Sequence, residues 1–245
     1  MSANKLRDIV KRATRPMRMW IAESPSTRDT RLIWYQLRKR GLKRVLTRNF
    51  YDENFYAEHV SLKPAYQELA ELIFKRFQPR SVCDFGCGNG FLLQFLAQRG
   101  VDVSGFEGSA ASLDFMDRGL RERVSIRNLA EAIDTEMHEL VISTEVAEHL
   151  PKKASPVLID NLTKSASKAI VFSAAKPGQW GDGHINCQPR EFWIKLFAAR
   201  GWSYDQAATN DLTSAIKRSA EIAQKLPWLV DNFMLFAPVG RTLNQ

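Results

Sequence analysis

The sequence has 245 residues, a hydrophobic fraction of 44%, a charged fraction of 25% and a formal net charge of +8. These values are typical of a globular protein with one α/β domain and an extension. No apolar run reaches the roughly 20 residues of a membrane-spanning helix, and no secretory signal follows the basic N-terminus, so we expect a cytoplasmic protein. The cysteines Cys83, Cys87 and Cys187 are too few and too scattered for a disulfide framework or a structural zinc site.

The positive charge is concentrated in residues 1–50, which contain 14 Lys and Arg against 3 Asp and Glu. Aromatic residues such as Trp20 and Trp34 stand beside the basic ones, a pattern typical of amphipathic helices at a headgroup interface. We predict a basic, largely helical N-terminal extension over residues 1–60 and a folded domain over residues 61–245. The extension could contact an anionic membrane surface, which would make the protein peripheral to the membrane, contact nucleic acid, or dock on the folded domain as a lid.

Helix and strand signals alternate along the folded domain. Pro64 at a first helical turn, followed by apolar residues at helical spacing, predicts a helix over 64–77. Short apolar runs predict strands over 81–85, 101–106, 124–127, 140–144, 169–174 and 231–236, and further helices are expected over 91–98, 189–199 and 211–224. This alternation implies an α/β fold, a Rossmann-like, doubly wound, mainly parallel sheet with helices on both faces.

The most informative segment is the bend that joins the strand 81–85 to the helix 91–98. It carries Gly86, Cys87, Gly88 and Gly90. Glycines at such a bend permit a tight turn and the close approach of a ligand to the backbone. Glu107 ends the next strand, 21 residues beyond Gly86, close to the spacing at which an acid meets ribose hydroxyls. The bend and the acid together predict a nucleotide-type cofactor site.

The pattern Asp84-x-Gly86-x-Gly88-x-Gly90 resembles the first motif of class I S-adenosylmethionine-dependent methyltransferases, whereas nicotinamide and flavin enzymes use GxGxxG. The resemblance implies that S-adenosylmethionine lies on the bend, with Asp84 near its cationic methionine end and Glu107 on both ribose hydroxyls. The positions that the family places beside the adenine and along the cofactor are Asn128, Leu129 and Thr144. The alternatives are a nicotinamide or flavin enzyme and a fold relative that has lost catalysis.

A second group of ionisable residues, Glu145, Glu148 and His149, follows the strand 140–144. Ligands bind at the carboxyl ends of strands in open α/β sheets, so this group is expected to face a substrate. If the segment is helical, Glu145 faces the other two residues at i+3 and i+4. Two carboxylates and an imidazole can hold a divalent cation such as Mg²⁺ or Mn²⁺.

The pattern Glu-x-x-Glu-His resembles that of the ubiquinone-biosynthesis O-methyltransferases and of the small-RNA 2′-O-methyltransferases. The resemblance implies that the RNA enzymes' metal site, which uses this cluster and a later histidine, could be completed here by His184, after the strand 169–174. The RNA enzymes usually carry a second histidine where this chain has Leu150. A hydroxyl is a poor nucleophile until its proton leaves, and a histidine or a metal ion can promote that step. We therefore expect catalytic roles for His149, His184 and Glu145. In a metal-dependent enzyme, the candidate ligands are Glu145, Glu148, His149 and His184.

The sequence as a whole predicts an O-methyltransferase of the broad bacterial small-molecule type. Its expected acceptor is a hydroxyl on a small molecule, a sugar or a glycan, and the segment 205–228 is expected to shape the acceptor pocket. The alternatives are an RNA 2′-O-methyltransferase, a quinone or lipid O-methyltransferase at the membrane surface, and a catalytically silent cofactor-binding protein. The slightly acidic folded domain argues against RNA.

Overall fold

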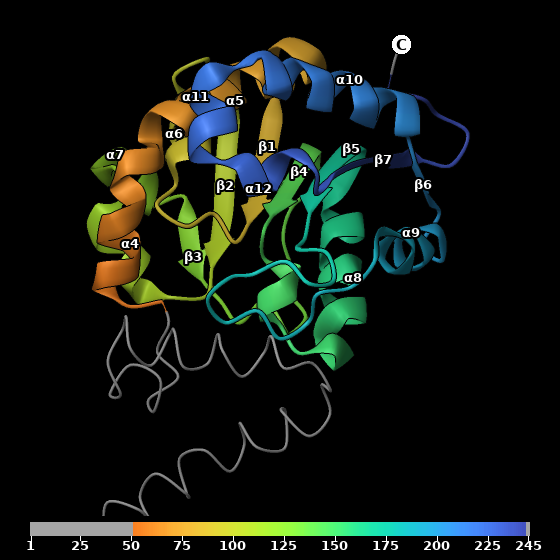
Figure 1. Cartoon of the computed structure of the whole chain (residues 1–245), viewed down its shortest axis with the longest axis horizontal. Helices are drawn as coiled ribbons and strands as arrows, with labels where there is room; N and C mark the ends of the chain where they lie inside the picture. Colours follow the sequence, from red (N-terminus) through yellow and green to blue (C-terminus); the bar gives the residue numbers. More distant parts are fainter. Residues whose placement is uncertain (1–50, 244–245) are drawn as a thin grey trace, which may run out of the picture. The chain divides into compact units, whose positions relative to one another are not determined.

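Within residues 51–243, which the structure describes, one seven-stranded sheet in the order β3-β2-β1-β4-β5-β7-β6 forms the centre of the computed structural model (Figure 1). The strands are β1 Ser81–Phe85, β2 Asp102–Glu107, β3 Val124–Ile126, β4 His138–Thr144, β5 Ala166–Ser173, β6 Trp202–Tyr204 and β7 Phe233–Pro238. Strands β1 to β5 are parallel, whereas β7 is antiparallel to both β5 and β6. The predicted α/β fold with a mainly parallel, doubly wound sheet is confirmed.

The helices alternate with the parallel strands. They are α4 Glu53–His59, α5 Lys63–Phe77, α6 Phe91–Ala97, α7 Arg118–Arg121, α8 Ser155–Ser165, α9 Arg190–Ala198, α10 Gln206–Arg218, α11 Ala220–Lys225 and α12 Pro227–Val230. Short 3-10 turns are η1 Val60–Leu62, η2 Ala110–Phe115, η3 Ala147–His149 and η4 Lys152–Ala154. The elements predicted over 64–77, 91–98 and 189–199 thus correspond to α5, α6 and α9.

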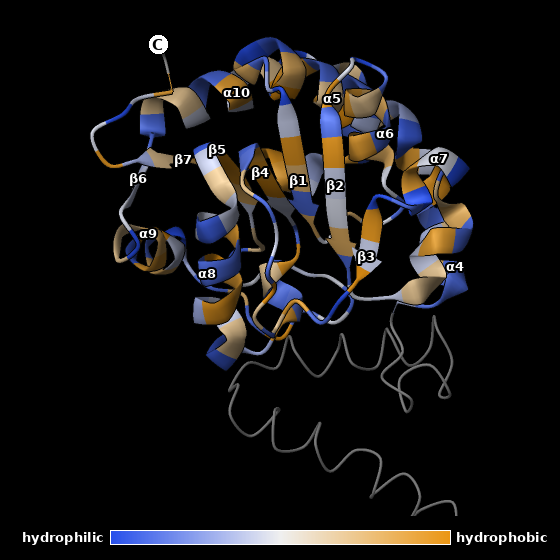
Figure 2. Cartoon of the chain, turned by 180° about the vertical axis from the view of Figure 1, so that it is seen from behind, coloured by the Kyte–Doolittle hydropathy of each residue, from blue (hydrophilic) through white to orange (hydrophobic). Residues whose placement is uncertain are grey.

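Each face of the sheet has its own hydrophobic core, because successive side chains of a strand point to opposite faces. On β4, Leu140 and Ile142 pack with α5, α6, α10 and α11, whereas Val141 packs with α8 and α9 (Figure 1). The central strands are therefore apolar on both sides, as parallel strands covered by helices must be. Figure 2 shows the helices with hydrophilic and hydrophobic stripes, as expected for helices that lie on a sheet.

The helix predicted over 211–224 is wrong as a single element. The structure has two helices there, α10 and α11, which are separated at Ser219. The backbone of Ser219 is extended, with φ −80° and ψ 113°, and its side-chain oxygen accepts a hydrogen bond from the backbone N–H of Ile222. Serine favours such N-cap positions over helix interiors, which is why the chain starts a new helix at this residue.

Strand β6 and helix α4 are two of the elements that had no counterpart in the sequence prediction. Strand β6 has three residues, of which only Trp202 is buried, so it shows no clear alternation. Helix α4 lies within residues assigned above to the extension. It begins at Asp52, whose side chain accepts from the backbone N–H of Phe55, and it packs on η2. The compact unit of the described chain begins at Tyr51.

The basic segment 1–50, with its predicted helices and its membrane or nucleic-acid contacts, lies outside the described residues. Among the described residues, no helix combines the length and the apolarity that a bilayer crossing requires.

Candidate active site

The glycine bend connects β1 to α6 through three residues in the left-handed region. Gly86, Gly88 and Gly90 have φ values of +88°, +55° and +68°. A Cβ on Gly86 would lie 2.3 Å from Cγ2 of Val146, so only glycine fits there. A Cβ on Gly88 would meet no atom within 4 Å. The bend thus packs tightly on the protein at Gly86 and presents its backbone outward at Gly88.

The carboxylate of Glu107, at the end of β2, closes the other side of this bend. Its Oε2 accepts from the backbone N–H of Gly88 at 2.8 Å, and its Oε1 accepts from those of Gly108 and Ser109 at 2.7 and 3.1 Å. The phenol of Tyr56 donates to Oε1 at 3.2 Å. The predicted pairing of the glycine bend with an acid after the second strand is therefore present in the structure.

Asp84, the last polar residue before the bend, is buried and incompletely bonded. Its side chain is 3% exposed, and its Oδ1 has no hydrogen-bond partner among the described residues. Burial, reinforced by the nearby charge of Glu107, raises the pKa of Asp84 to about 8. An unpartnered buried carboxyl is costly unless a donor or a cation meets it, so Asp84 is suited to face the cationic part of a ligand.

The remaining predicted cofactor residues have mixed surroundings. Cys87 is buried, and burial raises the pKa of its thiol well above the usual range, so it contributes backbone and bulk rather than a nucleophile. Leu129 is buried, and Thr144 is half-buried at the end of β4. Asn128 is exposed, with Oδ1 accepting from the backbone N–H of Ala130 at 3.1 Å. A role for Asn128 at the adenine stays a prediction.

Glu145 begins the second group of ionisable residues in an unusual backbone conformation. Its φ is 55°, which is strained for a residue other than glycine. Ser173 on β5 bonds it twice through its hydroxyl, which accepts from the Glu145 N–H at 3.0 Å and donates to Oε1 at 2.8 Å. The Nδ2 of Asn232 bonds both carboxyl oxygens, at 3.1 and 3.2 Å. Strained residues held by several partners are common at functional sites.

Glu148 lies on η3 and is fully buried. One carboxyl oxygen, Oε1, accepts from the backbone N–H of Ala175 at 3.1 Å, while Oε2 has no hydrogen-bond partner among the described residues. Burial and the charge of Glu145 raise the pKa of Glu148 well above its usual range. The loop after β5 is tied to the same residue, since the N–H groups of Ile185 and Asn186 donate to its backbone carbonyl at 2.9 and 3.0 Å.

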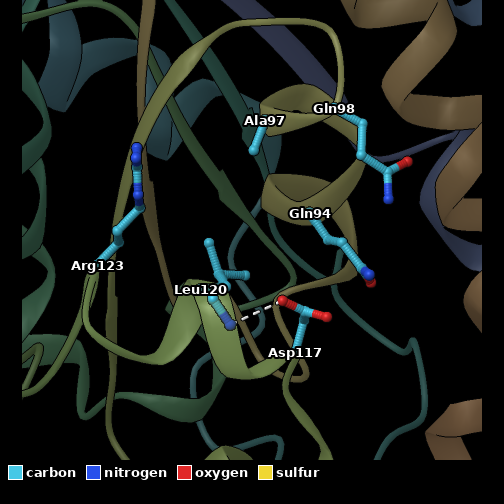
Figure 3. A pocket seen from close by; sticks show the side chains of 7 residues that line it. Gln94, Ala97, Gln98, Asp117, Leu120 and Arg123 are labelled. Atoms are coloured by element: carbon cyan, nitrogen blue, oxygen red, sulfur yellow. Dashed lines mark hydrogen bonds between the residues drawn. The ribbon is translucent and has the colours of Figure 1, made fainter.

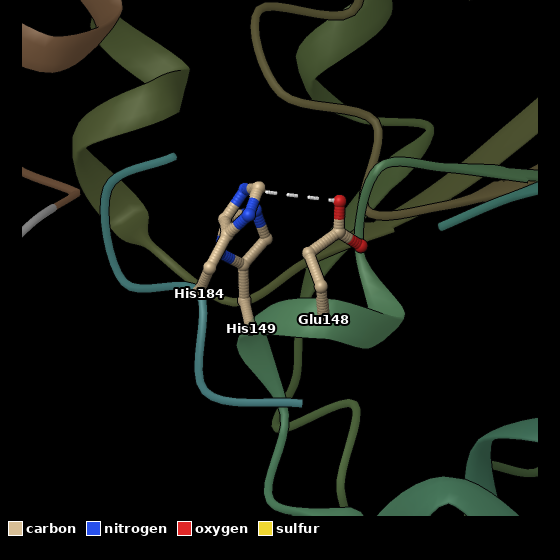
Figure 4. Close-up of side chains that lie close together, drawn as sticks. All are labelled: Glu148, His149 and His184. Atoms are coloured by element: carbon tan, nitrogen blue, oxygen red, sulfur yellow. Dashed lines mark ion pairs between the residues drawn. The ribbon is translucent and has the colours of Figure 1, made fainter. Parts of the chain in front are cut away.

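This loop places His184 beside His149 and Glu148, as Figure 4 shows. The two imidazole rings meet edge to face at 4.9 Å, and Nε2 of His184 lies 3.9 Å from Oε1 of Glu148. Burial lowers the pKa of His149 to about 3 and also lowers that of His184. Both rings are therefore neutral at pH 7, and Nδ1 of His149 is buried without a hydrogen-bond partner in the described chain.

The expected helical spacing of this group is wrong. Only Ala147–His149 forms a 3-10 turn, and the left-handed backbone of Glu145 precludes a helix through it. One ligand atom each from Glu148, His149 and His184 lies within 4.8 Å of the others, which is the only such arrangement found among residues 51–243. Glu145 lies outside it, with its carboxylate directed to Ser173 and Asn232.

Several residues that complete the site were missed in the sequence. Asn232 precedes β7, and Gln179 lies in the loop after β5, donating to Oε2 of Glu145 at 3.4 Å. Tyr51 packs its ring edge-on to His149 at 5.4 Å. None of these residues lies near the glycine bend in sequence. The only signal available was the polar or aromatic character of single residues at the start of a predicted strand, in a loop and in the extension.

A separate surface hollow of about 290 Å³ lies between α6 and α7. Gln94, Gln98, Asp117 and Arg123 line it, together with small and apolar residues (Figure 3). None of the residues predicted for the site borders it, so this hollow has no part in the site described above.

Comparison with known proteins agrees with this geometry. A family model described as "Methyltransferase domain" matches residues 56–207. The chain is 32% identical over 152 residues to the ubiquinone biosynthesis O-methyltransferase of Bordetella avium, covering 59% of this chain and 57% of the relative. It is 33% identical over 134 residues to the enzyme of the same name from Hahella chejuensis, covering 51% and 50%. The chain thus spans about half the length of the curated relatives it matches.

Among solved structures, the amino pentose methyltransferase CalS10 from Micromonospora echinaspora superimposes with a TM-score of 0.55. The match covers 78% of this chain and 99% of that one. Because the sequence identity is only 13%, the match shows a common fold and nothing more. The seven-stranded sheet, the glycine bend and the acid after β2 define a class I, Rossmann-like methyltransferase fold. The chain belongs to the methyltransferase-domain family.

Proposed function

We propose that this protein transfers the methyl group of S-adenosylmethionine to a hydroxyl of a small molecule. The observation that carries the proposal is the set of buried polar atoms without partners at the carboxyl ends of the strands. Asp84 Oδ1 lies near the carboxyl end of β1, and His149 Nδ1 and Glu148 Oε2 lie after β4. Buried polar atoms of this kind call for a ligand, because leaving them unpaired costs about 1–3 kcal/mol each.

The residues around the glycine bend fit S-adenosylmethionine. Gly88 leaves room against the backbone, Glu107 offers a carboxylate for ribose hydroxyls, and Asp84 offers one for the cationic end. When bound, this cofactor supplies a methyl group activated by a sulfonium. Asn128, Leu129 and Thr144 extend the proposed cofactor site toward the strands β3 and β4.

The histidines suit the removal of a proton from the acceptor. In the transfer, the hydroxyl oxygen forms a bond to the methyl carbon as the carbon–sulfur bond breaks, and the hydroxyl proton passes to His149 or His184. Both imidazoles are neutral at pH 7, as a base must be. A pKa of about 3 makes His149 a weak base, which favours His184 as the proton acceptor. The carboxyl of Glu148, 3.9 Å from His184, would stabilise the resulting imidazolium, and Glu145 would fix the backbone on which the pair stands.

The same atoms fit a divalent cation such as Mg²⁺ or Mn²⁺. Glu148, His149 and His184 converge within 4.8 Å, and two of their ligand atoms have no other partner in the described chain. A cation there would lower the pKa of an acceptor hydroxyl. The proposal keeps these three of the four predicted ligands, because the carboxylate of Glu145 is directed elsewhere.

The nature of the acceptor follows from the relatives and from the shape of the site. The relatives that match half of the chain are named ubiquinone biosynthesis O-methyltransferases, which supports a hydroxyl acceptor. The ring of Tyr51 packs edge-on to that of His149, which places an aromatic side chain beside one of the two proposed proton acceptors. We propose a small hydroxylated compound, a sugar or a glycan as the acceptor.

The direct test incubates the full chain with S-adenosylmethionine carrying a labelled methyl group. Hydroxylated aromatics and sugars, their amino counterparts, and an RNA with a free 3′ end are offered as separate acceptors, with and without Mg²⁺ or a chelator. We expect labelled methyl ethers, with release of S-adenosylhomocysteine, from a hydroxyl compound only. Transfer to amines alone would contradict the choice of oxygen, and transfer to RNA alone would replace the small-molecule acceptor. If a chelator does not change the rate of methyl transfer, the proposed role of a divalent cation is contradicted.

A further inference from the structure

Helix α4 is attached to both loops of the proposed cofactor site. The Nδ2 of Asn89, in the glycine bend, donates to the backbone carbonyl of Tyr56 at 3.0 Å. The hydroxyl of Ser109, in the loop after β2, donates to the carbonyl of Tyr51 at 2.7 Å. Hydrogen bonds from two separate loops thus hold the segment that contains α4 at Tyr51, just before the helix, and at Tyr56, within it. It is therefore a fixed wall of the site rather than a loosely attached cover.

The side chain of Tyr56 extends from this wall to the carboxylate of Glu107. It is 2% exposed, and its ring lies near that of Phe115 in a stacked orientation, with 6.5 Å between the ring centres. Its hydroxyl donates to Oε1 of Glu107 at 3.2 Å. Burial raises the pKa of this phenol above its ordinary value, so it remains a donor at every working pH.

The donors on Glu107 are unevenly shared between its two oxygens. Among residues 51–243, Oε1 accepts from Tyr56, Gly108 and Ser109, whereas Oε2 accepts from Gly88 alone. Rotation of a terminal carboxylate is soft, so its plane is set by the donors around it. The three backbone donors belong to the loops themselves, and Tyr56 is the donor that links the plane to α4. This arrangement leaves acceptor capacity on Oε2, on the side of the glycine bend.

We propose that Tyr56 is a positioning residue for the cofactor, whose phenol fixes the Glu107 carboxylate so that it can accept hydrogen bonds from the ribose hydroxyls. The proposal rests on the proposed function, since it requires a ribose-containing cofactor on Glu107. It assigns a role in the site to α4, which lies in the segment that the sequence placed outside the folded domain.

The test compares Tyr56→Phe with the wild-type full chain by calorimetric titration with two probes. One probe is S-adenosylhomocysteine, and the other is its 2′,3′-dideoxy analogue, which lacks the ribose hydroxyls. We expect Tyr56→Phe to weaken binding of S-adenosylhomocysteine about tenfold and to leave the affinity for the analogue unchanged within about twofold. The matched control is Tyr204→Phe, which removes a phenol that accepts from Arg190 at 3.0 Å on the edge strand β6. This control should bind both probes as the wild type does.

Each other outcome has a definite meaning. Unchanged or tighter binding of S-adenosylhomocysteine by Tyr56→Phe overturns the proposal, and tighter binding would show that the phenol competes with the ribose. An equal loss for both probes also overturns it, because the effect would then come from packing and not from the hydroxyls. A melting temperature close to that of the wild type excludes unfolding as the cause. Failure of the wild type to bind S-adenosylhomocysteine contradicts the proposed function itself.

Discussion

The two halves of the proposed active site are built by different means. Around the glycine bend, backbone N–H groups from two adjacent loops hold the acid Glu107, and the glycines at positions 86, 88 and 90 set the path of the chain. Around His149, side chains from distant segments do the holding, since Ser173 and Asn232 fix Glu145. The first half needs about 25 consecutive residues, counted from Asp84 to Ser109, and the second draws on residues up to 87 positions apart.

Because the two halves are built differently, we expect substitutions to affect the cofactor half and the histidine half in different ways. A cofactor site made of backbone tolerates little substitution except on its exposed side. A cluster made of side chains from separate loops can be altered one residue at a time, with effects on the acceptor rather than on the cofactor. The comparison predicts that substitutions in the two halves have separable effects on binding and on turnover.

The largest separation is expected for His149→Ala. Loss of a proton acceptor or a cation ligand should lower turnover about 10³-fold, while the Kd for S-adenosylhomocysteine changes less than about twofold. Turnover is measured with the hydroxyl acceptor that the labelling test identifies. The control His138→Ala removes a histidine from the opposite end of β4, where it contacts Ser104. This variant should have a lower melting temperature but a turnover close to that of the wild type. Equal loss of turnover in both variants would show that the two halves are not separable.

The reverse pattern is expected for Glu107→Ala. This change removes the carboxylate proposed for the ribose, and the Kd for S-adenosylhomocysteine should rise about 100-fold, since hydrogen bonds to a charged group contribute about 1.5–3 kcal/mol. Asp102→Ala makes the same substitution at the other end of β2, where the acid pairs with Arg123 on the surface. It should leave the Kd unchanged. Calorimetry showing wild-type affinity in Glu107→Ala would contradict the cofactor site.

A smaller effect on affinity is expected when a Cβ is added to the glycine bend at Gly88. Gly88→Ala and Gly100→Ala both place a Cβ at positive φ, +55° and +80°, where it meets no atom within 4 Å. The backbone strain should therefore cost each variant about 1 kcal/mol of unfolding free energy. Only Gly88→Ala should also weaken S-adenosylhomocysteine binding, by about tenfold. Denaturant unfolding and calorimetry on both variants test this pair, and equal affinities would show that the ligand does not approach Gly88.

The smallest effect concerns pH. Because the pKa of Asp84 is raised to about 8, its carboxyl is mostly protonated at pH 6 and increasingly ionised toward pH 8. The ionised form attracts the cationic cofactor, so the Kd for S-adenosylmethionine should fall about fivefold as pH rises from 6 to 8. Asp84→Asn should abolish this dependence. A slope that persists in Asp84→Asn would assign the titration to another group.

The contrast between the halves also explains how much could be predicted from the sequence. The sheet, most of its strands and the pairing of the bend with Glu107 follow from local patterns, because strand, glycine bend and acid succeed one another within a short segment. The convergence of His149 and His184 was expected from the resemblance to methyltransferases with a later histidine, and it is possible because both residues follow neighbouring parallel strands. The support of Glu145 by Asn232 could not be predicted, because it depends on where the antiparallel β7 returns to the sheet.

The break at Ser219 and the position of α4 escaped prediction for related reasons. A serine that is compatible with a helix interior becomes an N-cap only when the following turn packs against α5. Helix α4 has seven residues and one fully buried side chain, Tyr56, so its apolar periodicity is weak. Its place is determined by hydrogen bonds to two loops that are not adjacent to it in the sequence.

The late position of Asn232 has a consequence for how the molecule is made on the ribosome. By the time β4 has emerged, the residues that donate to Glu107 have been synthesised, whereas Asn232, the last of the partners of Glu145, is synthesised just before β7. Because domains acquire structure as the chain lengthens, a nascent chain would be able to form the nucleoside-binding half first. The reactive pair of histidines would then be completed only at the final stage of translation.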